Sequence, residues 1–279
     1  MNPENAGAEP FFLGTPRGQR FCVFHPPAGG HCAGAVLLAP PFGDEMNKSR
    51  RMAALQARRL AALGFGVLQV DLEGCGDSDG DLRDVRWSGW KSDLEAGAAW
   101  LAARLDAPLY LLGLRMGALL ALDFARGHAG VAGIVLWQPL ASGEAFITQI
   151  LRLKLAGSMA GPDSATAPST ATLRAALASG DMLEIGGYEI TGGLAADFGA
   201  LDLRALAPAS CPVRWFEMVA DAARPMPPGA ARIAEAWRAE GVAVTASPLA
   251  GPPFWSTQEI TECEALLDST CAACEGMRA

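Results

Sequence analysis

The chain has 279 residues, of which 51% are hydrophobic and 19% charged, and its formal net charge at pH 7 is −8. This length and apolar content are enough to bury one sizeable core. The chain is acidic and has neither a basic run nor an apolar run of membrane-spanning length. We therefore expect no nucleic-acid partner and no transmembrane segment.

The beginning of the chain, MNPENAGAEP, is polar and lacks the apolar core of a secretory signal. Seven scattered cysteines are an odd number and do not suggest a disulfide framework. These features predict a reduced, cytoplasmic protein. No ligand spacing typical of a metal site is present, so we expect neither a metal nor another cofactor.

The first predicted elements are two short β-like runs, FFLG and RFCVFH, which the turn at 15–18 joins into a hairpin. Strands of nearly continuous apolar character then alternate with helices, which is typical of parallel strands covered on both faces. The expected strands are 35–41, 66–74, 108–114 and 131–139, and the helices between them are 47–65, 88–105 and 116–127.

The alternation breaks after Pro139 and returns at 211. Between these points we expect a helix over 142–157, a flexible loop over 161–172, and short helices around one β-like piece. Strands 211–219 and 242–249 and helices 229–240 and 256–274 complete the pattern. We therefore predict one α/β domain over 1–279, in which 140–207 forms a lid inserted between core strands.

The segment Gly113-Leu114-Arg115-Met116-Gly117 joins a predicted strand to a predicted helix. A strand, a sharp turn flanked by glycines and a helix is the geometry of a nucleophile elbow, G-x-S-x-G, but here the central residue is arginine. The order of the elements, this elbow and the loops APPFGDEMNKSRR and DLEGCGDSDG together resemble the α/β-hydrolases. The resemblance implies that the first of these loops supplies oxyanion-hole backbone.

A more specific resemblance rests on PPFGDEMNKSRRM, DLEGCGDSDGD, GLRMGALLA, LWQPLASGEAFITQILRLKLA and GPPFWSTQEI. Together these motifs resemble the exosortase A system-associated hydrolase 2 family of bacterial α/β-hydrolase-like proteins. The resemblance implies that arginine at the elbow is a family trait. It also implies a role near exopolysaccharide production, without supplying a substrate.

A serine hydrolase needs a nucleophile, an acid and a histidine, in that chain order. Arg115 stays protonated at physiological pH, so it is neither a nucleophile nor a general base. Asp221 follows the strand near 213–219, where the resemblance places the acid; a solvated loop aspartate is the alternative. Pro253 falls where the histidine belongs, and the three histidines, at 25, 31 and 128, are predicted at the opposite edge of the sheet.

Two hypotheses describe Arg115. In the first, the elbow binds an anionic ligand through its guanidinium fork and the helix N-terminus. In the second, Arg115 pairs internally with Asp44, Glu45, Glu73 or Asp221, because a buried arginine needs a partner. The candidate ligand-binding residues at this edge are Phe42, Gly43, Glu45, Arg115, Met116 and Gln138.

The sequence leaves three functions open. The first is an accessory protein without a working triad that binds an anionic small molecule, or a glycan- or acyl-linked intermediate. The second is an atypical hydrolase or acyltransferase that uses Asp221, Glu45 and Arg115, with Arg115 stabilising negative charge. The third is an interaction protein that binds a protein partner through 140–207.

Overall fold

The computed structural model describes residues 7–159, 168–208 and 211–278, and it contains one large sheet of eight strands. The strand order is β1-β2-β4-β3-β5-β6-β9-β10, and the six strands from β4 to β10 along this order pair in parallel. The bounds are β1 Glu9–Thr15, β2 Gly18–His25, β3 Gly34–Ala39, β4 Phe65–Val70, β5 Leu109–Leu114, β6 Val131–Trp137, β9 Val213–Val219 and β10 Val244–Ala250. The predicted mostly parallel sheet is confirmed.

The hairpin predicted at the beginning of the chain is also confirmed. Strands β1 and β2 pair antiparallel, with Thr15 opposite Gly18, and β2 joins the sheet by pairing antiparallel with β4. Gly18 closes the turn with a φ of 106°, a conformation that other residues rarely adopt. This hairpin therefore adds two antiparallel strands to one side of a parallel sheet.

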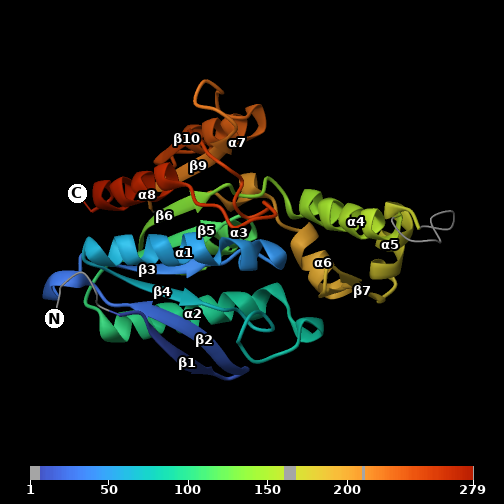
Figure 1. The fold of residues 1–279 in the computed structure, drawn as a ribbon, viewed down its shortest axis with the longest axis horizontal. Helices are drawn as coiled ribbons and strands as arrows, with labels where there is room; N and C mark the ends of the chain where they lie inside the picture. The colour runs from blue at the N-terminus through green and yellow to red at the C-terminus, as the bar shows by residue number, and fades with distance from the viewer. Residues whose placement is uncertain (1–6, 160–167, 209–210, 279) are drawn as a thin grey trace.

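Helices cover both faces of the sheet (Figure 1). Helices α1 (Asp44–Ala62) and α8 (Glu264–Gly276) contact each other on one face, and α2 (Trp87–Arg104), α3 (Met116–Gly127) and α7 (Pro228–Ala239) pack on the other. Strand β3 is buried along its whole length because it lies between these two layers. The two faces explain why the central strands are nearly continuously apolar.

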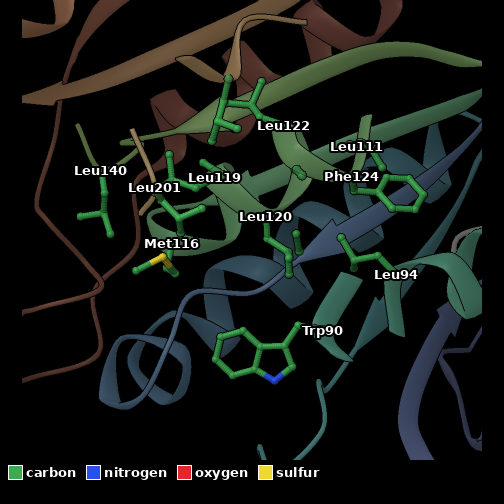
Figure 2. Packing of buried hydrophobic residues seen from close by; sticks show 14 of the residues in the cluster. Trp90, Leu94, Leu111, Met116, Leu119, Leu120, Leu122, Phe124, Leu140 and Leu201 are labelled. Atoms are coloured by element: carbon green, nitrogen blue, oxygen red, sulfur yellow. The ribbon is translucent and has the colours of Figure 1, made fainter. Parts of the chain in front are cut away.

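Helix α3 lies in the middle of the larger core. Figure 2 shows Leu120 of α3 directed toward Trp90 of α2, and Met116 and Leu119 belong to the same buried cluster. Leu119 is fully buried, and Leu120 and Trp90 are each 1% exposed. A helix that is apolar on nearly all sides must be buried on all sides, so the elbow at its N-terminus is fixed to the centre of the molecule.

Between β6 and β9 the chain leaves the sheet, and the described parts of this excursion, 143–159 and 168–206, are together called the lid segment below. It projects sideways from the core in Figure 1. It contains α4 (Gly143–Met159), α5 (Thr170–Ala178), the hairpin of β7 (Met182–Ile185) and β8 (Tyr188–Thr191), α6 (Gly192–Gly199) and the 3-10 helix η5 (Leu203–Leu206). An aromatic cluster attaches the lid segment to the core. The ring centroid of Phe42 lies 5.4 Å from that of Phe198 and 5.9 Å from that of Tyr188.

Several element bounds differ from the sequence prediction. Helix α1 begins at Asp44 and not at 47, because Gly43 adopts a φ of 67° and turns the chain directly into the helix. One β-like piece was expected in the lid, yet the structure has two strands, joined by a two-residue turn in which Gly186 and Gly187 both have positive φ. Helix α8 begins at Glu264, where a start near 256 was expected.

The loop expected over 161–172 falls mostly outside the described residues, and its last part is helical because α5 begins at Thr170. Ser169 caps this helix by accepting a hydrogen bond from the Thr172 backbone N–H, at 3.1 Å. In the parts of the chain that the structure describes, no helix is both long enough and apolar enough to cross a membrane.

Candidate functional site

The turn between β5 and α3 has the strained geometry of a nucleophile elbow. Arg115 adopts φ 57° and ψ −115°, a conformation that costs a residue with a side chain about 1–3 kcal/mol. A Cβ at Gly113 would overlap Ala118 and the carbonyl of Gly117, and a Cβ at Gly117 would overlap the carbonyl oxygen of Ala39. Both glycines are therefore required for the close approach of helix and strand, although the residue between them is arginine.

The Arg115 side chain forms an internal ion pair. Its Nη2 lies 3.0 Å from Oε1 of Glu45, and its Nε lies 3.1 Å from the same oxygen. The two side chains are 11% and 15% exposed, so the pair is mostly shielded from water. Of the partners proposed from the sequence, the structure selects Glu45, which the first turn of α1 places beside the elbow.

An aromatic ring covers the other side of Arg115. The guanidinium carbon lies 5.3 Å from the ring centroid of Trp255, within the range of a cation–π contact. Trp255 belongs to the loop after β10, the loop in which the resemblance places a catalytic histidine. Pro253, which takes the place of that histidine in the sequence, is exposed, whereas Phe254 and Trp255 are buried.

The carboxyl group of Glu45 has a raised pKa. Burial is the main cause, because it disfavours the charged form, and the neighbouring Arg115 opposes this effect through its charge and its hydrogen bonds. A carboxyl with a raised pKa in a hollow is the kind of group that enzymes use as a general acid or base. In this structure, however, the carboxylate oxygens of Glu45 accept hydrogen bonds from Arg115.

A cavity of about 810 Å³ lies between the lid segment and the core. Of the candidate ligand-binding residues, Phe42, Gly43 and Glu45 line it. Arg115 and Met116 do not line it; Glu45 and Trp255 form the wall at this point, and Met116 is 1% exposed in the core. Arg115 therefore lies behind the cavity wall, and its contact with a ligand stays a prediction.

Gln138 was a candidate ligand-binding residue, but its side chain forms hydrogen bonds within the sheet. Its amide nitrogen donates to Oε1 of Glu217 at 2.9 Å, and its amide oxygen accepts from the backbone N–H of Met218. It has a φ of 45° and does not line the cavity. These hydrogen bonds of Gln138 therefore connect the C-terminal end of β6 to β9.

Glu217 is a buried acidic residue that the sequence analysis missed. It is 7% exposed, and its Oε2 accepts a hydrogen bond from Nε1 of Trp215 at 2.8 Å. Burial raises its pKa, against the influence of the Trp215 hydrogen bond and the Arg115 charge. A charged residue in the strand WFEMV, between apolar neighbours, was the only available signal of a buried carboxyl.

Asp221, the proposed catalytic acid, lies outside this site. Its side chain is 59% exposed and pairs with Arg224 at 3.5 Å, and its Oδ1 accepts the backbone N–H of Ala223. The solvated-loop alternative is therefore the one that the structure supports. The set of Asp221, Glu45 and Arg115, suggested as an unorthodox catalytic site, is not brought together.

The three histidines lie away from the elbow, as predicted. His25 pairs with Val67 near the beginning of β4, and burial lowers its pKa. His31 precedes β3, and His128 follows α3 and lies 3.4 Å from Glu95. Within the described ranges, no group of three or more His, Cys, Asp or Glu side chains is arranged to hold a metal ion.

Solved structures with the same fold are numerous, and the two described next are distant in sequence. The chain superimposes with a TM-score of 0.65 on Est1E from Butyrivibrio proteoclasticus with bound ferulic acid, at 16% identity over 95% of this chain and 96% of the other. A thermostable carboxyl esterase from Bacillus coagulans also gives 0.65, at 13% identity over 99% and 100%. These likenesses establish the α/β-hydrolase fold.

Sequence comparison adds a curated relative, the thermostable monoacylglycerol lipase of Bacillus sp. (strain H-257), which is 29% identical over 133 residues. The match covers 48% of this chain and 45% of the relative, so it spans about half of each. A family profile described as "Serine aminopeptidase, S33" matches residues 30–178, more than half of the chain. This match agrees with the elbow and the sheet order. The chain therefore belongs to the serine aminopeptidase S33 family of α/β-hydrolases.

Proposed function

We propose that this chain is a non-catalytic member of its family that binds an acyl- or glycan-linked amphiphile between lid and core. It would act as a cytoplasmic accessory in exopolysaccharide or exosortase-linked biosynthesis, the setting that its motif resemblance suggests. One observation carries the proposal: the elbow position is filled by Arg115 in an ion pair with Glu45, beside a cavity of about 810 Å³.

The chemistry of the elbow supports binding without ester cleavage. Serine hydrolysis requires a hydroxyl and a base that removes its proton. Position 115 supplies a permanently charged guanidinium, and the loop after β10 supplies Pro253 and Trp255 in place of a base. The ion pair with Glu45 and the ring of Trp255 also occupy the space above the elbow.

The cavity supports a ligand of moderate size. Pockets for small molecules are commonly about 300–1,000 Å³ and mostly apolar, with a few polar groups. Phe42, Phe146, Ile150 and Ile190 line this one, together with a small number of charged side chains. A ligand with an apolar portion would gain most from these walls.

The proposal is tested by separating binding from turnover. We expect no labelling by a fluorophosphonate probe and no turnover of an ester panel by the purified chain. In a thermal-shift screen of fatty acids, fatty alcohols and glycolipid headgroups, we expect a stabilising ligand of the acyl type. Ile150→Trp, which fills the cavity from the lid side, should abolish the shift.

Labelling or turnover that co-purifies with the wild-type chain would contradict the proposal. So would the absence of any stabilising ligand. Capture of a protein partner that is lost on deletion of the lid segment would then favour the interaction function.

The atypical hydrolase remains the second candidate, and one observation favours it. Glu45 lines the cavity and has a raised pKa, as expected for a general base. If this candidate is correct, ester turnover should be measurable and should fall at least about a hundredfold in Glu45→Gln, the contribution typical of a general base. An unchanged rate in Glu45→Gln would exclude it.

A further inference from the structure

The cavity has an uneven distribution of charge, which suggests how a ligand is oriented. We infer that it holds a single-chain amphiphile with an anionic head on Lys154 of the lid segment and its apolar chain directed toward Phe42 and Phe146. The inference rests on the proposed function. It places the ligand's charge at the lid, whereas a family substrate would place its reacting group at the elbow.

The charged groups on the core side of the cavity already have partners. Glu45 pairs with Arg115 at 3.0 Å, and Lys48 pairs with Asp44 at 2.9 Å. An anionic head at the elbow would have to displace the Glu45 carboxylate from Arg115, at the cost of leaving that carboxylate half-desolvated. Among the described residues of the core wall, each positive charge therefore already faces a carboxylate.

Lys154 on α4 differs from these groups. It lines the cavity, it is half-buried, and its Nζ donates to the backbone carbonyl of Glu184 at 2.7 Å. No carboxylate within the described residues lies within 4 Å of its ammonium group. An ammonium has three donors, so two remain for an anion, and the carbonyl contact holds the group in place.

The Glu184 carboxylate also borders the cavity, and it could instead attract a cationic head. Its side chain is exposed, and it also borders a second, more polar hollow of about 720 Å³ beside Asp81 and Glu189. Water screens an exposed charge more strongly than a half-buried one. Lys154 therefore provides the stronger attraction, and the anionic head is favoured.

The apolar groups lie deeper than Lys154. Phe42, Phe146 and Ile190 are each less than 10% exposed, and all three belong to the larger hydrophobic core. Phe42 and Phe146 form part of the aromatic junction between lid and core. Leu153, next to Lys154 on α4, is 61% exposed and also borders the cavity. An apolar chain that starts at Lys154 can therefore run from the exposed border to the buried junction.

The test uses decanoate, decyl phosphate and decan-1-ol, which share one chain and differ in the head, with binding measured by isothermal titration calorimetry. We expect Lys154→Met to weaken both anions about tenfold, the loss typical of a charged hydrogen bond, and to change decan-1-ol less than twofold. Lys154→Arg should retain most of the affinity. Arg152→Met, two residues away on the exposed side of α4, is the matched control and should bind like wild type.

The possible outcomes distinguish the orientation of the ligand from the proposed function. If anions and alcohol bind equally and Lys154→Met changes neither, the orientation is wrong while the proposed function stands. If Arg152→Met weakens the anions as much as Lys154→Met, the effect is one of general charge and the site is not at Lys154. If none of the three ligands binds a folded wild-type chain, both claims fail.

Discussion

The two walls of the cavity are built differently. Directly behind the core wall, the elbow is held by the close approach of Gly117 to Ala39, and Glu45 of the wall pairs with Arg115. On the lid wall, apolar side chains dominate, and Leu153 remains 61% exposed. Among the described residues, Lys154 has a backbone carbonyl as its hydrogen-bond partner and no carboxylate.

The difference indicates which wall is adapted to a ligand. Groups that satisfy one another stabilise the fold but have little left to offer a ligand. Groups with unused donors or exposed apolar surface can gain from one. Under the proposed function, the elbow contributes to the fold, and the lid wall offers the groups that a ligand can use.

The largest expected effect comes from the backbone approach behind the core wall, at the elbow. Gly117→Ala should destabilise the protein by about 3 kcal/mol, because the new Cβ overlaps the Ala39 carbonyl and helix α3 must move. Gly127→Ala is the control in the same helix: a Cβ there meets nothing within 4 Å, so its effect should be within about 1 kcal/mol. Urea unfolding measures both, and similar losses in the two variants would contradict this description of the elbow.

The next effect concerns the ion pair. Glu45→Leu should cost about 2 kcal/mol, because it leaves the Arg115 charge in a mostly shielded place without its partner. The double variant Glu45→Leu/Arg115→Met should recover to within about 1 kcal/mol of wild type, because both charges are gone. Urea unfolding of Glu45→Leu, Arg115→Met and the double variant completes a double-mutant cycle with wild type. If the stability lost by the double variant equals the sum of the two single losses, the pair contributes no coupling energy.

A smaller effect is expected where the lid segment joins the core. Asp197 of α6 accepts hydrogen bonds from Nε of Arg86 at 2.7 Å and from the backbone N–H of Trp87, the first residue of α2, at 3.0 Å. The lid thus caps a core helix, and Asp197→Ala should cost about 1 kcal/mol.

Hydrogen exchange should rise in the lid segment of Asp197→Ala and stay unchanged in the sheet. The control is Asp268→Ala, which removes an exposed pair with Arg59 between two core helices. Equal exchange in the lid segment of both variants would show that Asp197 does not hold the lid.

The smallest effect is a pH dependence. Because burial raises the pKa of Glu217, its ionisation opposes folding. The stability of wild type relative to Glu217→Gln should therefore increase as the pH falls from 7 toward the ordinary glutamate pKa of about 4.3, and decrease as the pH rises through the folded value. Urea unfolding at pH 7 and pH 5 measures this difference. A difference of opposite sign would mean that hydrogen bonds to the carboxylate outweigh its burial.

Much of the site region could be predicted from local sequence. The helix over 116–127, the glycines around Arg115 and the distance of the histidines from the elbow all follow from patterns within a few residues. The sequence limited the partner of Arg115 to four candidate carboxylates, but it could not identify which of them forms the ion pair. Asp221 and Gln138 were placed at the correct edge, yet neither could be oriented, because loop and turn geometry decides where their side chains point.

By itself, the sequence determined the parallel sheet, the elbow and the arginine at its centre, because apolar periodicity, glycine spacing and residue identity are local properties. Only the tertiary structure decided that Glu45 pairs with Arg115 and that Trp255 covers this guanidinium. It also decided that, among the described residues, no carboxylate pairs with Lys154 on the lid side of the cavity. These contacts join residues far apart in the chain. Their energies depend on distance and burial, which no local pattern contains.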